Sequence, residues 1–138
     1  MQLYSNNIRV IDSMPIPVCE FGRAHFSKCF KGEASYGICA SKKETYFGFK
    51  FHALTTVDGF LTDYVITPAN IDDRNAVWDL CDKYRSISII GDKGYINKRL
   101  TPELKSERDI DLLFLKRANS RDNYPKEVRQ LLFKVRRR

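Results

Sequence analysis

The chain opens on a short, β-prone apolar run, residues 8–11, which ends at Asp12. Pro15 and Pro17 follow, and proline cannot continue a central strand because it has no backbone N–H to donate. Asp12 is therefore predicted to lie where a strand stops. Residues 15–45 show no regular period, which predicts an irregular loop, and a loop of this length in a compact domain is usually functional or mobile.

In residues 46–56 two kinds of side chain alternate along the chain, as they do in a strand whose two faces differ. The two faces carry Phe47, Phe49, Phe51 and Ala53 against Gly48, Lys50, His52 and Leu54. An Asp58-Gly59 pair separates this strand from a second β-prone run, residues 60–67. An Asp-Gly pair between two such runs predicts an antiparallel hairpin.

Helical and buried-strand patterns alternate after the hairpin. Pro68 ends the second strand, and Asn70 or Asp72 can cap the helix that follows. Apolar residues then recur at helical spacing: Val77, Leu80, Cys81 and Tyr84; Ile96, Leu100 and Leu104; Val128, Leu131, Leu132 and Val135. Residues 86–91 and 110–115 are apolar runs typical of buried strands. The order predicts one α/β domain over residues 1–138, with a mixed sheet and helices packed on its faces.

Positive charge is concentrated at the C-terminal end of the chain. The 138 residues carry 24 Lys and Arg against 17 Asp and Glu, for a net charge of +7. Residues 116–138 hold nine of these cations and two of the acids, so the first 115 residues are neutral overall. A positive field at one end attracts polyanions by releasing their counterions, which makes nucleic acid the leading partner. A solvated basic terminus is the alternative.

The remaining composition argues against several other classes of protein. Hydrophobic residues make up 43% of the chain and charged residues 30%, as in globular proteins. Because no apolar stretch approaches the roughly 20 residues of a membrane helix and no signal segment opens the chain, a soluble, cytoplasmic protein without a membrane partner is expected. The four cysteines form no C-x-x-C pair, which favours buried or idle thiols over zinc ligands and disulfides.

Two aspartates, Asp12 and Asp92, each follow a predicted core strand. Reactive groups of open α/β sheets cluster beyond strand ends, so the two carboxylates can meet there if the strands are neighbours. Carboxylate oxygens suit Mg²⁺ or Mn²⁺ and not zinc. The alternative is that both are ordinary turn residues, since Asp favours turns through hydrogen bonds to its own backbone.

Short strings in a fixed order along the chain resemble a known family. They are Val10-Ile11-Asp12-Ser13, Phe30-Lys31-Gly32 with Ala34 and Gly37, Phe47-Gly48-Phe49-Lys50-Phe51-His52, Thr67-Pro68-Ala69-Asn70 with Asp73, and Gly91-Asp92-Lys93-Gly94-Tyr95. The ordered set is similar to the catalytic core of bacterial insertion-sequence transposases of the DDE class, over nearly the whole chain. The resemblance implies a ribonuclease-H-like fold that holds three acidic residues, with Asp12 as the first and Asp92 as the second.

The resemblance also implies a chemistry and its partners. Two Mg²⁺ or Mn²⁺ ions about 4 Å apart clamp the attacking and leaving oxygens of a phosphoryl displacement, in which water attacks for strand cleavage and a DNA 3′-hydroxyl for strand transfer. Asp12 would be the shared metal ligand, and Asp92 would hold one ion. The implied partners are insertion-sequence ends and target DNA in the bacterial cytoplasm, at the nucleoid, and a homo-oligomer is compatible with this.

The third acid is where the sequence departs from the family pattern. In the resembling enzymes it follows a basic stretch like residues 134–138, where this chain ends. Glu127 precedes that stretch and is interpreted as a solvated helix residue, and Glu103 and Glu107 are weaker candidates. These transposases also carry a DNA-recognition segment ahead of the first catalytic strand, which here begins close to Met1. A catalytic core shortened at both ends, with impaired activity, is therefore expected.

Basic residues near the acids are candidates for contacts with DNA. Lys50 would bind phosphate and His52 would orient water or a leaving group, unless their strand face is the solvated side of an edge hairpin. Lys93 and Tyr95 are expected to contact DNA beside Asp92 through charge and stacking, unless they are only turn residues. The basic end of the chain, Arg136, Arg137 and Arg138, is expected to contact DNA as well. Two other functions stay open at this point: a non-catalytic basic DNA-binding module, and a ribonuclease-H-type metal-dependent nuclease unrelated to transposition.

Overall fold

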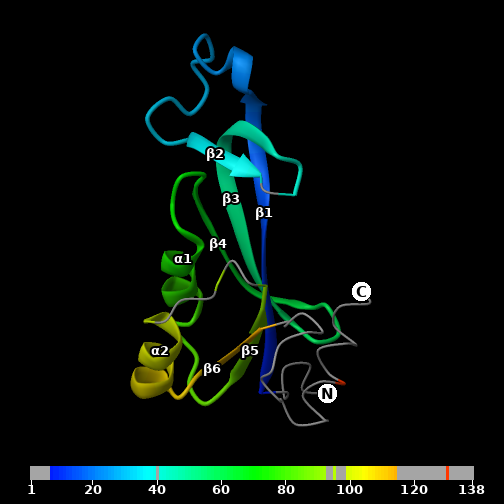
Figure 1. Cartoon of the computed structure of the whole chain (residues 1–138), viewed down its shortest axis with the longest axis vertical. Helices are drawn as coiled ribbons and strands as arrows, with labels where there is room; N and C mark the ends of the chain where they lie inside the picture. The colour runs from blue at the N-terminus through cyan, green and yellow to red at the C-terminus, as the bar shows by residue number, and fades with distance from the viewer. Residues whose placement is uncertain (1–6, 40, 93–94, 96–98, 115–129, 131–138) are drawn as a thin grey trace. The chain divides into compact units, whose positions relative to one another are not determined.

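The computed structural model of the chain describes residues 7–39, 41–92, 95, 99–114 and 130. Within these residues six strands, two α-helices and one 3₁₀ helix are present (Figure 1). In chain order they are β1 (Ile8–Glu20), η1 (Phe21–Arg23), β2 (Ser35–Cys39), β3 (Glu44–Thr56), β4 (Leu61–Pro68), α1 (Asp73–Leu80), β5 (Ser88–Gly91), α2 (Leu100–Arg108) and β6 (Asp111–Phe114).

The strands form one mixed sheet, which confirms the predicted fold class. Its strand order is β2-β3-β1-β5-β6, with β4 paired to β3. The chain divides into two compact units. The first unit comprises Met1–Ile11, Thr55–Thr62 and Tyr84–Arg138, and the second comprises Asp12–Leu54 and Asp63–Lys83.

The first unit is built on parallel strands. β1 pairs with β5 so that Ile8 lies beside Ser88 and Val10 beside Ile90, and β5 pairs with β6 in the same direction. α2 lies beside these strands in Figure 1 and buries Leu104 completely. The buried side chains of this unit include Ile11, Ile89, Ile90, Leu100, Leu104, Ile110 and Leu112. The predicted strands at 86–91 and 110–115 and the helix through Leu100 and Leu104 are therefore confirmed in the described residues.

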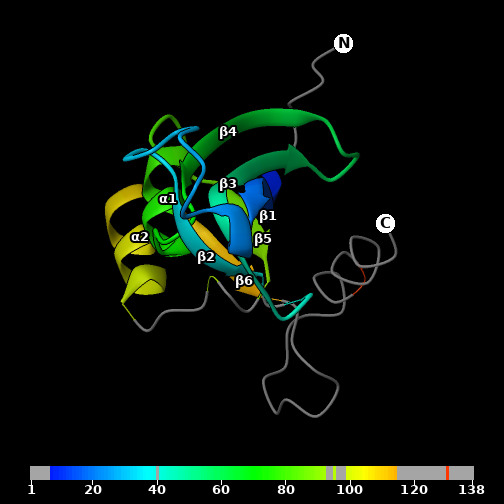
Figure 2. The same ribbon diagram turned by 90° about the horizontal axis from the view of Figure 1, so that it is seen from above.

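The second unit contains α1 and most of the β3–β4 hairpin, whose turn, Thr55–Thr62, belongs to the first unit. β3 and β4 are joined by only four residues, 57–60, and a connection this short makes the pair antiparallel. Figure 2 shows α1 beside this hairpin. Asp72 caps α1, because its side chain accepts a hydrogen bond from the backbone N–H of Arg74 at 3.0 Å, and the Arg74 side chain lowers the pKa of Asp72 to about 2. The helix buries Ala76, Val77 and Leu80.

The expectation that the first strand stops at Asp12 is wrong, because β1 continues to Glu20 through both prolines. A Cβ placed on Gly48 of β3 would strike the carbonyl oxygen of Ile16 and the backbone nitrogen of Val18, so even-numbered residues of β1 turn their backbone groups towards β3. Pro15 and Pro17 therefore direct their missing N–H away from β3. β5 pairs only with residues 8–10 of β1, so no ladder bond is lost there.

The prediction of an irregular loop over residues 15–45 is also wrong for the segment that forms β2. β2 lies inside it and pairs antiparallel with β3, with Tyr36 beside Phe47 and Ile38 beside Thr45. α1 ends at Leu80, so Val77 and Leu80 of the predicted helical stripe lie in the helix, Cys81 is its C-cap, and Tyr84 lies beyond its end. The predicted stripe at 128–135 and residue Ile96 lie outside the described residues. In the described part of the chain no helix is long and apolar enough to span a membrane.

Gly91 allows β1 and β5 to approach closely in the first unit. A Cβ at this position would lie 2.9 Å from Cγ2 of Ile11 and 3.4 Å from Cδ2 of Tyr95. Because Ile11 is β-branched and buried, its methyl group cannot move aside freely.

We therefore expect Gly91→Ala to lower the free energy of unfolding by about 1–3 kcal/mol through overpacking. Gly22→Ala is the matched control, since a Cβ at Gly22 meets nothing within 4 Å. Urea denaturation of the two variants measures the difference. Equal stabilities would contradict the close approach.

Candidate active site

Asp12 is an exposed residue within β1 and belongs to the second unit. The carboxylate accepts a hydrogen bond on Oδ1 from the backbone N–H of Ser13 at 2.8 Å. It directly follows Ile11, whose side chain is 2% exposed and belongs to the core of the first unit. A rigid strand therefore presents this carboxylate to solvent.

Asp92 directly follows β5 and is exposed. Its carbonyl oxygen accepts a hydrogen bond from the backbone N–H of Tyr95 at 3.1 Å, which closes a tight turn after the strand. The Tyr95 side chain is buried in the first unit, where it anchors the turn, so the expectation that Tyr95 stacks on DNA is wrong. The expectation that Asp92 lies at the C-terminal end of a core strand is confirmed.

Lys50 is held by the start of α1. Its Nζ donates to the carbonyl oxygen of Ile71 at 2.8 Å and forms an ion pair with Asp73 at 2.7 Å. The Lys50 and Asp73 side chains are only 21% and 25% exposed, so the pair is poorly solvated. A DNA phosphate would have to compete with Asp73 for this ammonium group.

His52 lies in the core of the second unit. Its side chain is fully buried, and Nε2 lies 3.1 Å from Oγ1 of Thr67 on β4. The other ring nitrogen, Nδ1, has no hydrogen-bond partner within the described residues. Burial lowers the pKa of His52 because desolvation disfavours the imidazolium, and this outweighs the opposing influence of Asp73.

The idea that the Lys50 and His52 face is the solvated side of an edge hairpin is therefore wrong. Alternate residues of β3 from Tyr46 to Thr56 form its more buried side, and α1 begins against it at Asp73. The phenylalanines on the opposite face are half-buried. The period-2 pattern identified two faces correctly, but not which of them is covered.

The other candidate residues lie elsewhere. Lys93, Glu127, Arg136, Arg137 and Arg138 fall outside the described residues. Glu103 and Glu107 are exposed on α2. No group of three or more His, Cys, Asp or Glu side chains suited to a metal ion is found among the residues that the structure describes.

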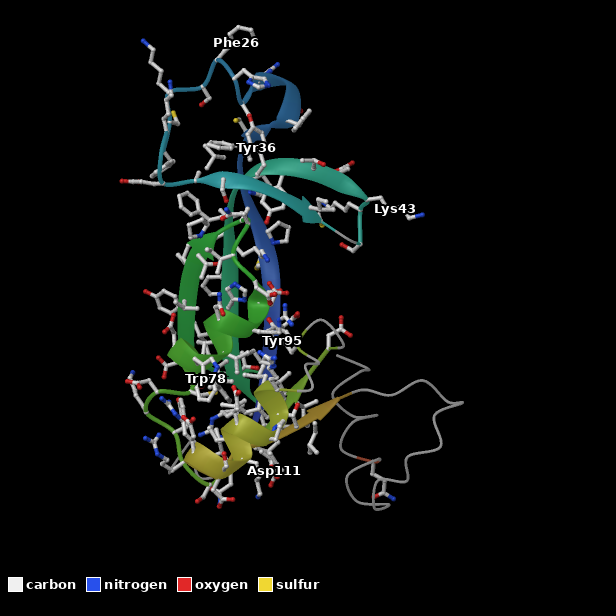
Figure 3. The ribbon with its side chains drawn as sticks, turned by 60° about the vertical axis from the view of Figure 1, so that its left-hand side comes forward. Phe26, Tyr36, Lys43, Trp78, Tyr95 and Asp111 are labelled. Atoms are coloured by element: carbon white, nitrogen blue, oxygen red, sulfur yellow. The ribbon has the colours of Figure 1, made fainter. Side chains whose placement is uncertain are left out.

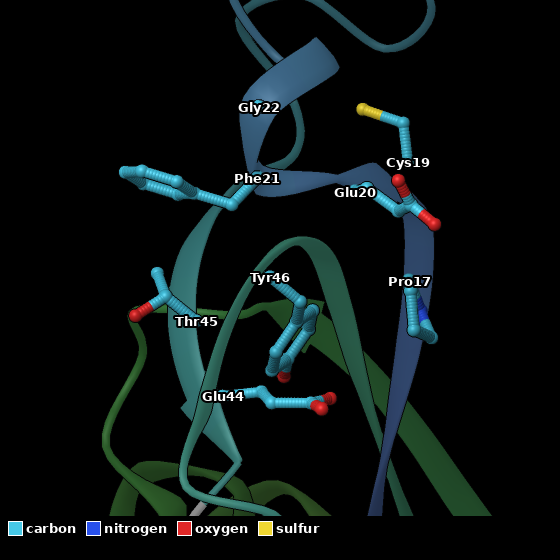
Figure 4. A pocket seen from close by; sticks show the side chains of 8 residues that line it. All are labelled: Pro17, Cys19, Glu20, Phe21, Gly22, Glu44, Thr45 and Tyr46. Atoms are coloured by element: carbon cyan, nitrogen blue, oxygen red, sulfur yellow. The ribbon is translucent and has the colours of Figure 1, made fainter.

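An open hollow of 600 Å³ lies in the second unit, between the end of β1 and the start of β3 (Figure 4). The carboxylates of Glu20 and Glu44 line it, together with the Cys19 side chain and the ring of Tyr46. Neither Asp12 nor Asp92 lines this hollow. It is therefore separate from the candidate metal ligands.

Comparison with known proteins identifies the family. The model of the transposase DDE domain matches residues 3–138. The chain belongs to the transposase DDE domain family. The resemblance of the ordered strings from Val10 to Tyr95 to DDE transposases is thereby confirmed at the level of the family. None of the curated proteins matches this transposase domain.

The fold of the transposase domain has a counterpart among solved structures. It is similar to a chain of a cryo-EM structure described as the piggyBac transposase synaptic complex with hairpin DNA, with a TM-score of 0.51 and 12% sequence identity. The match covers 90% of this domain and 26% of that chain. A likeness at this identity shows a shared fold.

The sequence patterns did not predict the contact that Asp73 makes with Lys50. Asp73 stands in one of the family-like strings, but the sequence placed it 23 residues from Lys50 with no sign of contact. An acidic residue at the first position of a helix was the only available indication, and helix dipoles alone explain such a residue.

The buried histidine predicts a specific pH dependence. Because the folded pKa lies below the unfolded value of about 6.5, the unfolded state binds more protons, and stability is lost as pH falls through about 6.5. We expect His52→Gln to abolish this loss between about pH 7.5 and pH 5.5. His25→Gln, at an exposed position, should retain it. Urea denaturation across this pH range checks the prediction, and equal slopes in both variants would contradict it.

Proposed function

We propose that this transposase domain is a metal-dependent catalytic core for DNA strand cleavage and strand transfer, with Asp12 and Asp92 as two of its metal ligands. The observation that carries the proposal is the parallel pairing of β1 with β5, which sets Val10 beside Ile90 in the first unit. Each aspartate follows its paired residue by the same two positions along the chain.

The donor chemistry of the two residues fits a hard divalent cation. Both side chains are carboxylates exposed to solvent, and both follow rigid, buried core residues, Ile11 and Gly91. Oxygen ligands of this kind suit Mg²⁺ or Mn²⁺. When bound, such ions stabilise the charge that develops on the attacking and leaving oxygens of a phosphodiester. The proposed role of the chain is to hold each carboxylate directly after a buried residue of a core strand.

The proposed substrate is DNA, in keeping with the DNA-bound state named for the structural neighbour. A transposase of this class would meet insertion-sequence ends and target DNA in a bacterial cytoplasm. It would act on them as a homo-oligomer or as a single chain. Lys93, Arg136, Arg137 and Arg138 are the proposed phosphate contacts. Lys50 and His52 instead act through position, since their polar groups connect β3 to α1 and β4.

A non-catalytic DNA-binding module is the second candidate function, favoured by the lack of a three-ligand cluster among the described residues. Metal binding separates the two. We expect Mn²⁺ to raise the thermal midpoint of unfolding of the parent chain by mass action, and Asp12→Asn or Asp92→Asn to abolish the rise because each removes an anionic ligand.

Asp58→Asn is the matched control for this experiment, since Asp58 is exposed in the β3–β4 turn and Asn-Gly serves the same turn. It should leave the response to Mn²⁺ unchanged. A response that survives in both the Asp12 and the Asp92 variants would favour the module. Cleavage without any joined product would favour a nuclease of ribonuclease-H type.

The basic end of the chain predicts a change in salt dependence. Replacing Arg136, Arg137 and Arg138 with Gln should flatten the slope of log affinity for duplex DNA against log salt by up to about 2.7, at roughly 0.9 for each neutralised phosphate. Fluorescence anisotropy over a salt series measures the slope. An unchanged slope would show that these arginines do not contact phosphates.

A further inference from the structure

The segment from Arg23 to Lys31, between β1 and β2 in the second unit, is a basic loop with an exposed aromatic tip. The Arg23, His25, Lys28 and Lys31 side chains are all exposed. The segment contains no carboxylate, and within the described residues none of its three Lys and Arg side chains forms an ion pair. This loop therefore presents three cations without an ion-pair partner in the described part of the chain, and the nearest carboxylates along the sequence, Glu20 and Glu33, lie just outside it.

The loop is held in place at both ends. Its first turn is closed by hydrogen bonds from the backbone N–H groups of Phe26 and Ser27 to the carbonyl oxygen of Arg23, both at 3.1 Å. Its last turn is closed by a hydrogen bond from the backbone N–H of Ala34 to the carbonyl oxygen of Phe30 at 2.9 Å, and Ala34 is buried. A positive φ of 52° at Phe30 is rare for a bulky residue and indicates that the surroundings impose this conformation.

The aromatic residues around the loop fall into two kinds. Phe30 packs edge-on against Phe49 with ring centroids 5.4 Å apart, and Phe21 packs edge-on against Tyr36 at 5.6 Å. These rings anchor the loop to β2 and β3. Phe26 is 87% exposed and makes no ring contact within the described residues. Figure 3 shows it at the outer end of the loop, directed away from the strands.

We propose that this loop binds unpaired DNA, with Phe26 stacking on an exposed base while Lys28 and Lys31 contact the flanking phosphates. An aromatic ring and cations on one surface are the combination that single strands bind, because every base has a face on which a ring can stack. In a duplex those faces are covered by neighbouring base pairs, so the ring finds no partner there. The inference rests on the proposed function, since strand cleavage and transfer generate unpaired ends.

The test is fluorescence anisotropy of the full chain with a labelled oligothymidine and a labelled blunt duplex, in chelator. We expect Phe26→Ala to weaken oligothymidine binding by roughly 5- to 150-fold and to leave duplex binding unchanged. Phe26→Trp should retain the affinity. Phe60→Ala is the matched control, because Phe60 is 51% exposed but lies in the β3–β4 turn. Replacing Lys28 and Lys31 with Gln should reduce the single-strand salt slope by up to about 1.4.

Three results would overturn the proposal. One is an equal effect of Phe26→Ala and Phe60→Ala on oligothymidine. Another is an equal loss of duplex and single-strand binding in Phe26→Ala. A third is an effect of Phe26→Ala on binding to phosphatidylserine vesicles but not to DNA, which would indicate a membrane surface. The Asp12→Asn variant separates failure of this proposal from failure of the catalytic proposal. It keeps the loop intact, so its oligothymidine affinity should stay unchanged, whereas its metal binding should be lost.

Discussion

The parallel pairing of β1 with β5 is the contact on which the first unit and the candidate site both depend. It sets the register of Val10 against Ile90, and the two aspartates follow at equal distances along the chain. The pairing is close enough that Gly91 has no room for a Cβ beside Ile11. Tight packing of this kind keeps Ile11 and Gly91, the residues directly before the two aspartates, in fixed positions within the first unit.

The second unit carries polar groups on the covered side of β3. Lys50 is neutralised by Asp73, and the Nε2 atom of His52 meets Thr67. Groups of this kind are costly to bury without partners, so their pairing fixes how α1 and β4 sit against β3 within this unit. Lys50 and His52 thereby belong to the scaffold of the domain, although their residue types suggest contacts with substrate.

Aromatic contacts explain why a segment without regular period is nevertheless ordered. The ring centroid of Tyr36 lies 5.2 Å from that of Phe47 and 5.6 Å from that of Phe21. The half-exposed face of β3 therefore supports β2 and the basic loop. Offset and edge-on ring pairs of this kind contribute about 0.5–1.5 kcal/mol each beyond their buried area. The loop can then expose Phe26 without losing its own conformation.

Local patterns were sufficient for much of this domain. Alternation, turn residues and helical spacing depend on short stretches of chain, and they predicted the hairpin, the α1 cap region, β5 and the position of Asp92 directly after it. Three features needed the tertiary structure. β1 passes through Pro15 and Pro17 because the side of each proline that lacks an N–H faces away from β3. β2 pairs with β3, which the local pattern did not indicate. The covered face of β3 is the one that α1 reaches. Each depends on which neighbour occupies one side of a strand, and a period along the chain holds no information about that neighbour.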